Sequence, residues 1–144
     1  MRHLVYLASL VFLVGTLIGC NSDVEVKRDK TKELQITARL KIHEGKLDEF
    51  KVLAAKCVQI VKEKDTGTLQ YDWFLSQDQS ECAVRETYVD SDALLQHMTN
   101  LGEAMGALFA TGDFSAEVYG NPSDELIKAT EGLDVVVYSY FQGL

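Results

Sequence analysis

The feature that most limits the fold is a strict alternation of side chains between Leu34 and His43. Every second residue from Leu34 to Ile42 is apolar, and the residues between them are polar or charged. A period of two places these two sets on opposite faces of a β-strand. The sequence therefore predicts a strand that is buried on one face only, and hence a sheet with one face covered by helices.

The segments that follow extend this pattern along the chain. Residues 46–64 carry apolar side chains at three- and four-residue spacing, which indicates a helix. Two aromatic or β-branched runs at 69–76 and 81–89 flank a polar turn, as expected for a pair of strands. Asp90 or Ser91 is suited to cap a second helix that runs to about Ala110.

The rest of the chain completes an α+β order. The remaining expected elements are a strand at 114–119, a short helix at 123–130 and a final strand at 134–141. The order β-α-β-β-α-β-α-β predicts a ferredoxin-like split β-α-β fold, with an antiparallel sheet and helices on one face.

The start of the chain is typical of an export signal. Residues 1–19 have a short basic start and a long apolar run. The run ends in Leu17-Ile18-Gly19-Cys20, which resembles the lipobox of bacterial lipoproteins, where cleavage precedes the cysteine and its thiol is acylated. The alternative is an uncleaved anchor helix, although the run is shorter than the ~20 apolar residues that a spanning helix needs.

These features predict three parts in the chain. Residues 1–19 are a lipoprotein signal peptide, residues 20–33 are a lipidated Cys20 and a charged tether, and residues 34–144 are one folded domain. We therefore expect a protein that is lipid-anchored in the bacterial cell envelope and faces the periplasm. We expect the N-terminal lipid to bind the protein to the membrane.

Charge and motif content exclude several classes of function. The formal net charge of −8 makes nucleic acid an unsuitable partner, because an acidic surface repels phosphates. No glycine-rich phosphate loop follows a strand. Only His43 and His97 remain after the signal, without the Cys/His spacing of a zinc site, so we expect no metal.

The segment between Glu86 and His97 carries a family resemblance. It has a Glu86-x-Tyr88 strand end, an Asp-Ser cap, a small apolar residue and then His97. This corner, together with Ala38–Lys41, Gly67–Asp72 and a late Pro-Ser before a helix, resembles the antibiotic biosynthesis monooxygenase family and its quinol-monooxygenase-like relatives. The resemblance covers about residues 34–144. It implies a homodimeric α+β barrel that oxidises a small aromatic or quinol-like molecule with O2 and no cofactor.

Under this resemblance, His97 and Glu86 are the candidate catalytic bases. A phenol becomes a far better electron donor as an anion, so deprotonation in a dry pocket is the main chemical task. Both side chains can titrate near neutrality when burial or a neighbour shifts the pKa. The candidate substrate-binding residues are Tyr88, Tyr71, Trp73 and Arg39.

Structural interpretations of the same residues stay open. His97 could cap a backbone carbonyl or pair with Glu86 only to hold the corner. Glu86 could form a buried ion pair with Arg39 or Arg85. The aromatic side chains could serve only the core or a dimer interface. The competing function is accordingly a non-catalytic lipoprotein of the same fold that binds a small ligand or acts as an interaction module.

The direction of one strand face decides where the pocket lies. Cys82, Glu86 and Tyr88 share a face by alternation, and we expect this face to point away from the helices, towards the sheet of a partner. Cys57 lies on the apolar stripe of the first helix. We therefore expect the thiols of Cys57 and Cys82 to be far apart, free and buried.

Overall fold

The computed structural model describes residues 31–144. The predicted signal peptide, Cys20 and most of the tether fall in residues 1–30, outside the described residues, and stay predictions. None of the helices in the described range is long and apolar enough to cross a membrane. The elements are β1 (Leu34–Ile42), α1 (Leu47–Lys64), β2 (Thr68–Leu75), β3 (Glu81–Tyr88), α2 (Ser91–Leu101), α3 (Glu103–Phe109), β4 (Gly112–Tyr119), α4 (Asp124–Ala129) and β5 (Val135–Tyr138).

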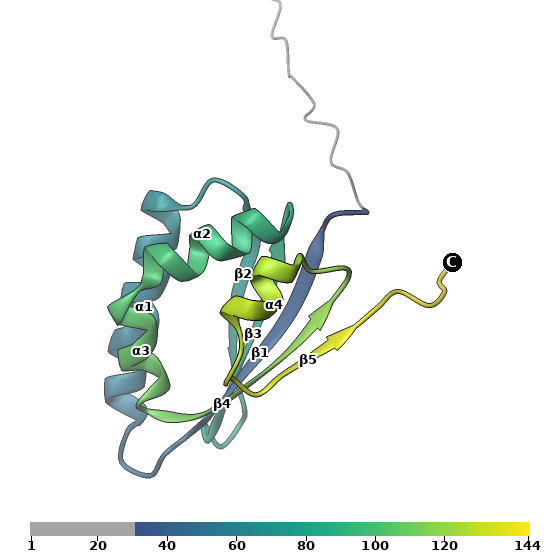
Figure 1. Ribbon diagram of the computed structural model, residues 1–144. Coiled ribbons are helices and arrows are strands. Elements are labelled where there is room, and N and C mark those ends of the chain that lie inside the picture. Colours follow the sequence, from purple (N-terminus) through teal and green to yellow (C-terminus); the bar gives the residue numbers. More distant parts are fainter. Residues whose placement is uncertain (1–30) are drawn as a thin grey trace, which may run out of the picture.

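The strands form one sheet in the order β2-β3-β1-β4-β5. Figure 1 shows the helices on one face of this sheet, with α1, α2 and α3 over one part and α4 over the strands near the C-terminus. This confirms the predicted ferredoxin-like α+β fold. The sheet is mixed rather than antiparallel throughout, because β5 runs parallel to β4 after the crossover through α4.

The second predicted helix is two helices in the structure. Asp90 caps α2, and its carboxylate accepts a hydrogen bond of 2.9 Å from the backbone N–H of Ala93. The helix ends at Gly102, whose φ of 44° and ψ of −120° lie outside helical geometry. A residue with a Cβ atom rarely adopts this backbone conformation, so glycine permits the break between α2 and α3.

The register of β1 and β3 corrects the predicted direction of the β3 face. Ile36 lies opposite Glu86, and Leu34 lies opposite Tyr88. Residues directly opposite each other point to the same side of a sheet, so Glu86 and Tyr88 point towards the helices, as Cys82 does. The prediction that they face a partner was wrong. Glu86 and Tyr88 are tolerated in the core because they hydrogen-bond to each other.

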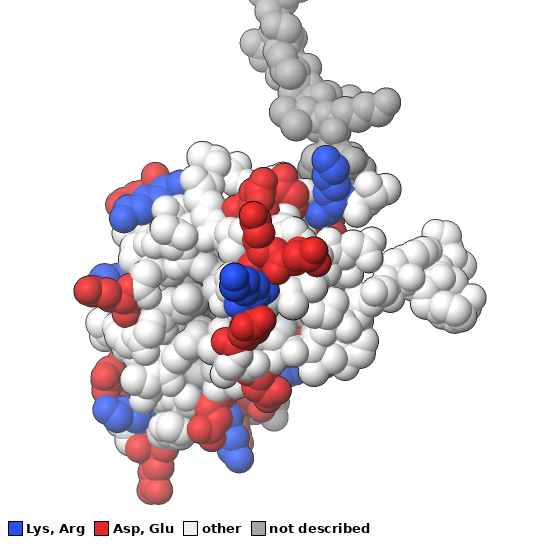
Figure 2. Space-filling model, in the orientation of Figure 1, with Lys and Arg blue, Asp and Glu red and all other residues white. Residues whose placement is uncertain are grey.

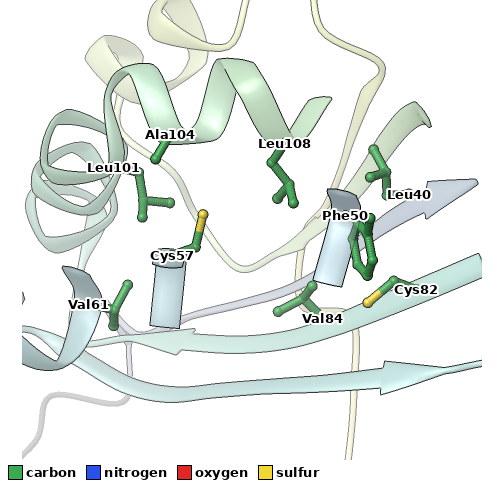
Figure 3. Close-up of a cluster of buried hydrophobic side chains, with 9 residues drawn as sticks. All are labelled: Leu40, Phe50, Cys57, Val61, Cys82, Val84, Leu101, Ala104 and Leu108. Carbon is green, nitrogen blue, oxygen red and sulfur yellow. The ribbon is translucent and has the colours of Figure 1, made fainter. Parts of the chain in front are cut away.

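The two cysteines both lie in one cluster of the core, between the sheet and the helices α1, α2 and α3. Figure 3 shows Cys57 beside Leu101 and Ala104, whereas Cys82 lies on the far side of Val84. Both thiols are buried and free, as predicted. The expected reason for their separation was wrong. The two thiols lie on the same side of the sheet, in one core cluster, and other core side chains lie between them.

Candidate active site

The centre of the site is a buried pair formed by His97 and Asp65. His97 lies on α2, and Asp65 is the C-cap residue of α1. The ring nitrogen Nδ1 of His97 is 2.7 Å from Oδ2 of Asp65, and the side chains are only 5% and 3% exposed. The pair thus joins the end of one helix to the middle of another.

Three donors surround the carboxylate of Asp65. Asn100 Nδ2 donates to Oδ1 over 2.7 Å, and Thr68 Oγ1 donates to Oδ2 over 2.7 Å. Burial works against the charged form, but the hydrogen bonds from Asn100, Thr68 and His97 together hold the pKa of Asp65 below its ordinary value. An ionised carboxylate only accepts hydrogen bonds, so Nδ1 of His97 carries the proton.

His97 itself is neutral at neutral pH. Burial lowers the pKa of the imidazole, and the neighbouring Asp65 carboxylate offsets this only in part. With the proton on Nδ1, the lone pair of Nε2 is unprotonated, and no residue within 31–144 hydrogen-bonds to it. The rings of Tyr71 and Tyr88 meet the imidazole edge-on at centroid distances of 5.0 and 5.2 Å. These contacts hold the ring in place.

A second proton-carrying group lies beside this pair. Tyr88 OH donates a hydrogen bond of 2.6 Å to Oε2 of Glu86. Burial raises the pKa of Glu86 to about 7, although the hydrogen bond from Tyr88 opposes the shift. Glu86 therefore exchanges its proton in the range where an acid–base catalyst is most effective.

A cavity of about 100 Å³ lies between the sheet and the helices, and both His97 and Glu86 line it. Tyr71 and Trp73 line it from β2. The remaining walls are mostly apolar, and include Leu94, Met98, Met105, Phe114 and Val118. An engineered apolar cavity of roughly 150 Å³ holds benzene, so this smaller space limits a bound ligand to at most one small ring.

Five of the predicted site residues line the cavity, namely His97, Glu86, Tyr71, Trp73 and Arg39. Tyr88 is fully buried and contacts Glu86 and His97, but it is not among the residues that line the cavity. The pocket was predicted between the sheets of two subunits. It lies instead on the helix side of one chain, because the β3 face points inward.

Arg39 lies at the edge of the site, and its predicted role in substrate binding stays a prediction. It contributes to the cavity wall, but its guanidinium bonds Glu81 over 3.2 Å, and the side chain is 47% exposed. The predicted alternative of an ion pair between Glu86 and Arg39 or Arg85 does not occur, since Tyr88 is the hydrogen-bond partner of Glu86. The positive charge of Arg39 is therefore paired with the carboxylate of Glu81.

Asp65 is a site residue that the sequence did not predict. This residue is 32 positions from His97, and no motif connects the two. One signal was available, because a carboxylate at the C-terminal end of a helix is disfavoured by the helix dipole and is unexpected there unless it has another task.

The structure also leaves the buried indole N–H of Trp73 without an acceptor among the described residues.

No group of three or more metal-ligating side chains occurs within residues 31–144. The titratable groups at the cavity are instead an imidazole and a carboxyl, which can accept and donate protons. The fold and the site together define a ferredoxin-like α+β domain with a buried acid–base cluster beside an apolar cavity.

Comparison with known proteins gives the family. The sequence model of the antibiotic biosynthesis monooxygenase family matches residues 34–111. This range takes in more than half of the chain, and the chain belongs to that family. No match was found among curated proteins.

Solved structures share the fold. MupZ from Pseudomonas fluorescens is 24% identical with a TM-score of 0.65, and the match covers 78% of this chain and 93% of MupZ. A conserved protein from Methanosarcina mazei Go1 is 18% identical with a TM-score of 0.57, and the match covers 63% of this chain and 94% of that protein. SnoaB from Streptomyces nogalater, a cofactor-independent oxygenase, is 17% identical with a TM-score of 0.55, and the match covers 64% of this chain and 95% of SnoaB.

Proposed function

We propose that this chain is a cofactor-independent monooxygenase that oxidises a small aromatic, quinol-type substrate with O2. The observation that carries the proposal is the buried imidazole of His97, which contacts Asp65 through Nδ1 and lines an apolar cavity together with Glu86. Membership of the monooxygenase family supports the reaction class. The description of SnoaB as a cofactor-independent oxygenase supports the absence of a cofactor.

The chemistry begins with proton removal. Nε2 of His97 takes the proton of a substrate hydroxyl, and the resulting anion donates electrons to O2. One oxygen atom forms a bond to a ring carbon, and the other leaves as water with two hydrogens from the substrate. The substrate is thus the only reductant. Glu86, when protonated, supplies a proton to the reduced oxygen, and His97 and Glu86 return to their starting states as water departs.

The cavity favours a neutral substrate. Its walls are mainly apolar, and the guanidinium of Arg39 is bound to Glu81. A charged ligand would lose its hydration there without a matching counter-ion. A neutral phenol avoids this cost and becomes charged only when His97 accepts its proton, so the two charges form together as a close pair. Tyr71 and Trp73 offer ring surfaces for an aromatic substrate.

We also propose that the protein works as a homodimer. The helices cover one face of the sheet and leave the other face uncovered (Figure 1). Residues 135–144 contain no charged side chain, and Tyr140 and Phe141 are 76% and 87% exposed. Figure 2 shows this uncharged segment extending from the body at the right. Because two chains of net charge −8 repel each other, an uncharged apolar segment suits contact with a second copy.

We further propose that the domain is lipid-anchored at Cys20 and lies on the periplasmic side of the bacterial envelope. This proposal rests on the sequence of residues 1–33 alone. Quinols partition into membranes, so a tether would keep such a domain near a lipid-soluble substrate. Release of the protein from membranes after Cys20→Ser, and its retention in the wild type, would support the anchor.

The test of the function is oxygen uptake by a protein that starts at residue 21. The assay compares methylhydroquinone, naphthohydroquinone and anthrone with and without the protein. We expect saturable oxygen consumption with at least one hydroquinone, and one oxygen atom from labelled O2 in the product. Saturable binding without oxygen uptake would instead support the non-catalytic ligand-binding lipoprotein.

A further inference from the structure

We propose that Asp65 is the positioning residue of the site, and that it holds the imidazole of His97 with Nδ1 protonated and Nε2 free to accept a proton in the cavity. This inference rests on the proposed role of His97 as the base. Its structural basis is the 2.7 Å contact between the two side chains at the junction of α1 and α2.

The position of Asp65 is energetically unfavourable for a carboxylate unless other interactions compensate. It is the C-cap of the 18-residue helix α1, where the negative end of the helix dipole disfavours a carboxylate. Its side chain is also almost completely buried, which adds a desolvation cost. Local rules of this kind are typically broken at functional sites, where another interaction compensates.

The compensation comes from three donors that fix the carboxylate in space. Asn100 lies three residues after His97, so both side chains project from the same side of α2 and contact Asp65 together. Thr68 donates from the start of β2. The carboxylate therefore cannot rotate without losing at least one bond, and its Oδ2 remains directed at Nδ1 of His97.

Packing around the imidazole leaves no other hydrogen-bond partner for it among the described residues. Tyr71 and Tyr88 each place a ring at 5.0 to 5.2 Å from the imidazole centroid, at steep interplanar angles. Glu86, the nearby titratable group on β3, is bonded to Tyr88 rather than to His97. Asp65 is consequently the only hydrogen-bond partner of the His97 side chain among the described residues, and it alone selects the tautomer.

The chain contains matched controls for this arrangement. His43 and Asp113 form an exposed pair with a 3.0 Å contact, and neither residue lines the cavity. Asp78 is an exposed carboxylate that accepts bonds from Ser76 and Ser80. Asp113→Asn removes the charge of a histidine partner, and Asp78→Asn removes a carboxylate with several donors, without changing the proposed site.

The experiment measures the tautomer of His97 by nitrogen NMR on the chain with His3→Gln, in which His43 and His97 are the remaining histidines, and His43→Gln then assigns the two rings. In the wild type we expect the proton of His97 on Nδ1. In Asp65→Asn we expect this preference to be lost, because the amide can donate to Nδ1. With methylhydroquinone as the probe, we expect kcat to fall by ~100-fold and KM to change by less than ~3-fold, as for loss of an oriented base. Asp113→Asn and Asp78→Asn should leave both readouts unchanged.

The outcomes separate the two proposals. A wild-type His97 that carries its proton on Nε2 overturns the role of Asp65, whatever the activity and even if Asp65→Asn does not fold. An unchanged tautomer in a folded Asp65→Asn protein also overturns it. An inactive wild type whose tautomer still depends on Asp65 overturns the proposed function and supports the positioning.

Discussion

Tyr88 donates a 2.6 Å hydrogen bond to Glu86 inside the core, two residues along the same strand. The outer surface repeats this geometry, since Tyr119 donates to Glu117 over 2.8 Å with the same spacing. Glu86 of the buried pair lines the cavity, whereas neither Glu117 nor Tyr119 lines it. The two pairs therefore form a matched comparison for the effect of burial on a carboxyl group.

Glu86→Gln should stabilise the protein at alkaline pH. The pKa of Glu86 in the folded protein, about 7, lies above its ordinary value of 4.5, so the folded state binds its proton more tightly than the unfolded state. Stability must then fall as the pH rises from about 4.5 to about 7. The amide has no proton to lose and still accepts from Tyr88. Urea unfolding should show a gain of ~2 kcal/mol at pH 8 and less than ~1 kcal/mol at pH 5.

Glu117→Gln is the control for this experiment, because it removes the carboxylate from an exposed Glu–Tyr pair of the same spacing. An equal response of both variants at pH 8 would mean that burial does not govern the titration of Glu86.

Gly102 and Gly106 should respond oppositely to alanine. Gly102 has a φ of 44° that alanine adopts only with strain, so Gly102→Ala should lower the free energy of unfolding by about 1–3 kcal/mol. Gly106 is inside α3, and a Cβ atom added there would meet no other atom within 4 Å, so Gly106→Ala should raise this free energy by up to ~1 kcal/mol. Chemical denaturation measures both. A stabilising Gly102→Ala would contradict the break between α2 and α3.

Met98→Ala should widen the substrate range. Met98 lines the cavity, whose volume of about 100 Å³ limits a ligand to at most one ring, and the truncation adds space at the cost of ~2–5 kcal/mol of stability. The ratio of kcat/KM for naphthohydroquinone to that for methylhydroquinone should rise by ~10-fold. Val52→Ala, at an exposed position of α1, should leave the ratio unchanged. A wild type that already prefers the larger quinol would contradict a one-ring cavity.

The uncharged C-terminal segment should control assembly. Phe141→Asp places a charge on a side chain that is 87% exposed and proposed to contact a second copy. We expect sedimentation velocity to show a dimer for the wild type and a monomer for the variant, because an unpaired buried charge is costly at an interface. Val52→Asp, at an exposed apolar residue on α1, is the control and should remain dimeric. A monomeric wild type would refute the proposed contact.

Periodicity was sufficient to predict the order of the elements, because the period of two in β1 and the helical stripe in α1 each follow from burial on one side. It could not orient β3. The alternation groups Glu86 with Tyr88 but does not say whether that group faces the core, and polar residues usually suggest solvent. Their mutual hydrogen bond, which makes burial tolerable, is visible only in three dimensions.

The site was predictable in part for the same reason. His97 and Glu86 lie within one continuous corner of sequence, so a local motif could identify them. Asp65 reaches His97 only after α1 and α2 pack together, and no local pattern encodes this contact. The break at Gly102 was also missed, because the apolar stripe continues across it and a single glycine does not by itself end a helix.

The central claim is that His97 removes a proton from a hydroxyl in the cavity, and the most direct measurement is an anaerobic absorption titration with a nitrophenol, whose neutral and anionic forms absorb at different wavelengths. At a pH below the pKa of the free phenol, wild-type protein should bind it with the absorption band of the anion. His97→Asn, which retains a donor near Asp65 but lacks Nε2, should bind it with the band of the neutral phenol. The same neutral band with both proteins would contradict the account.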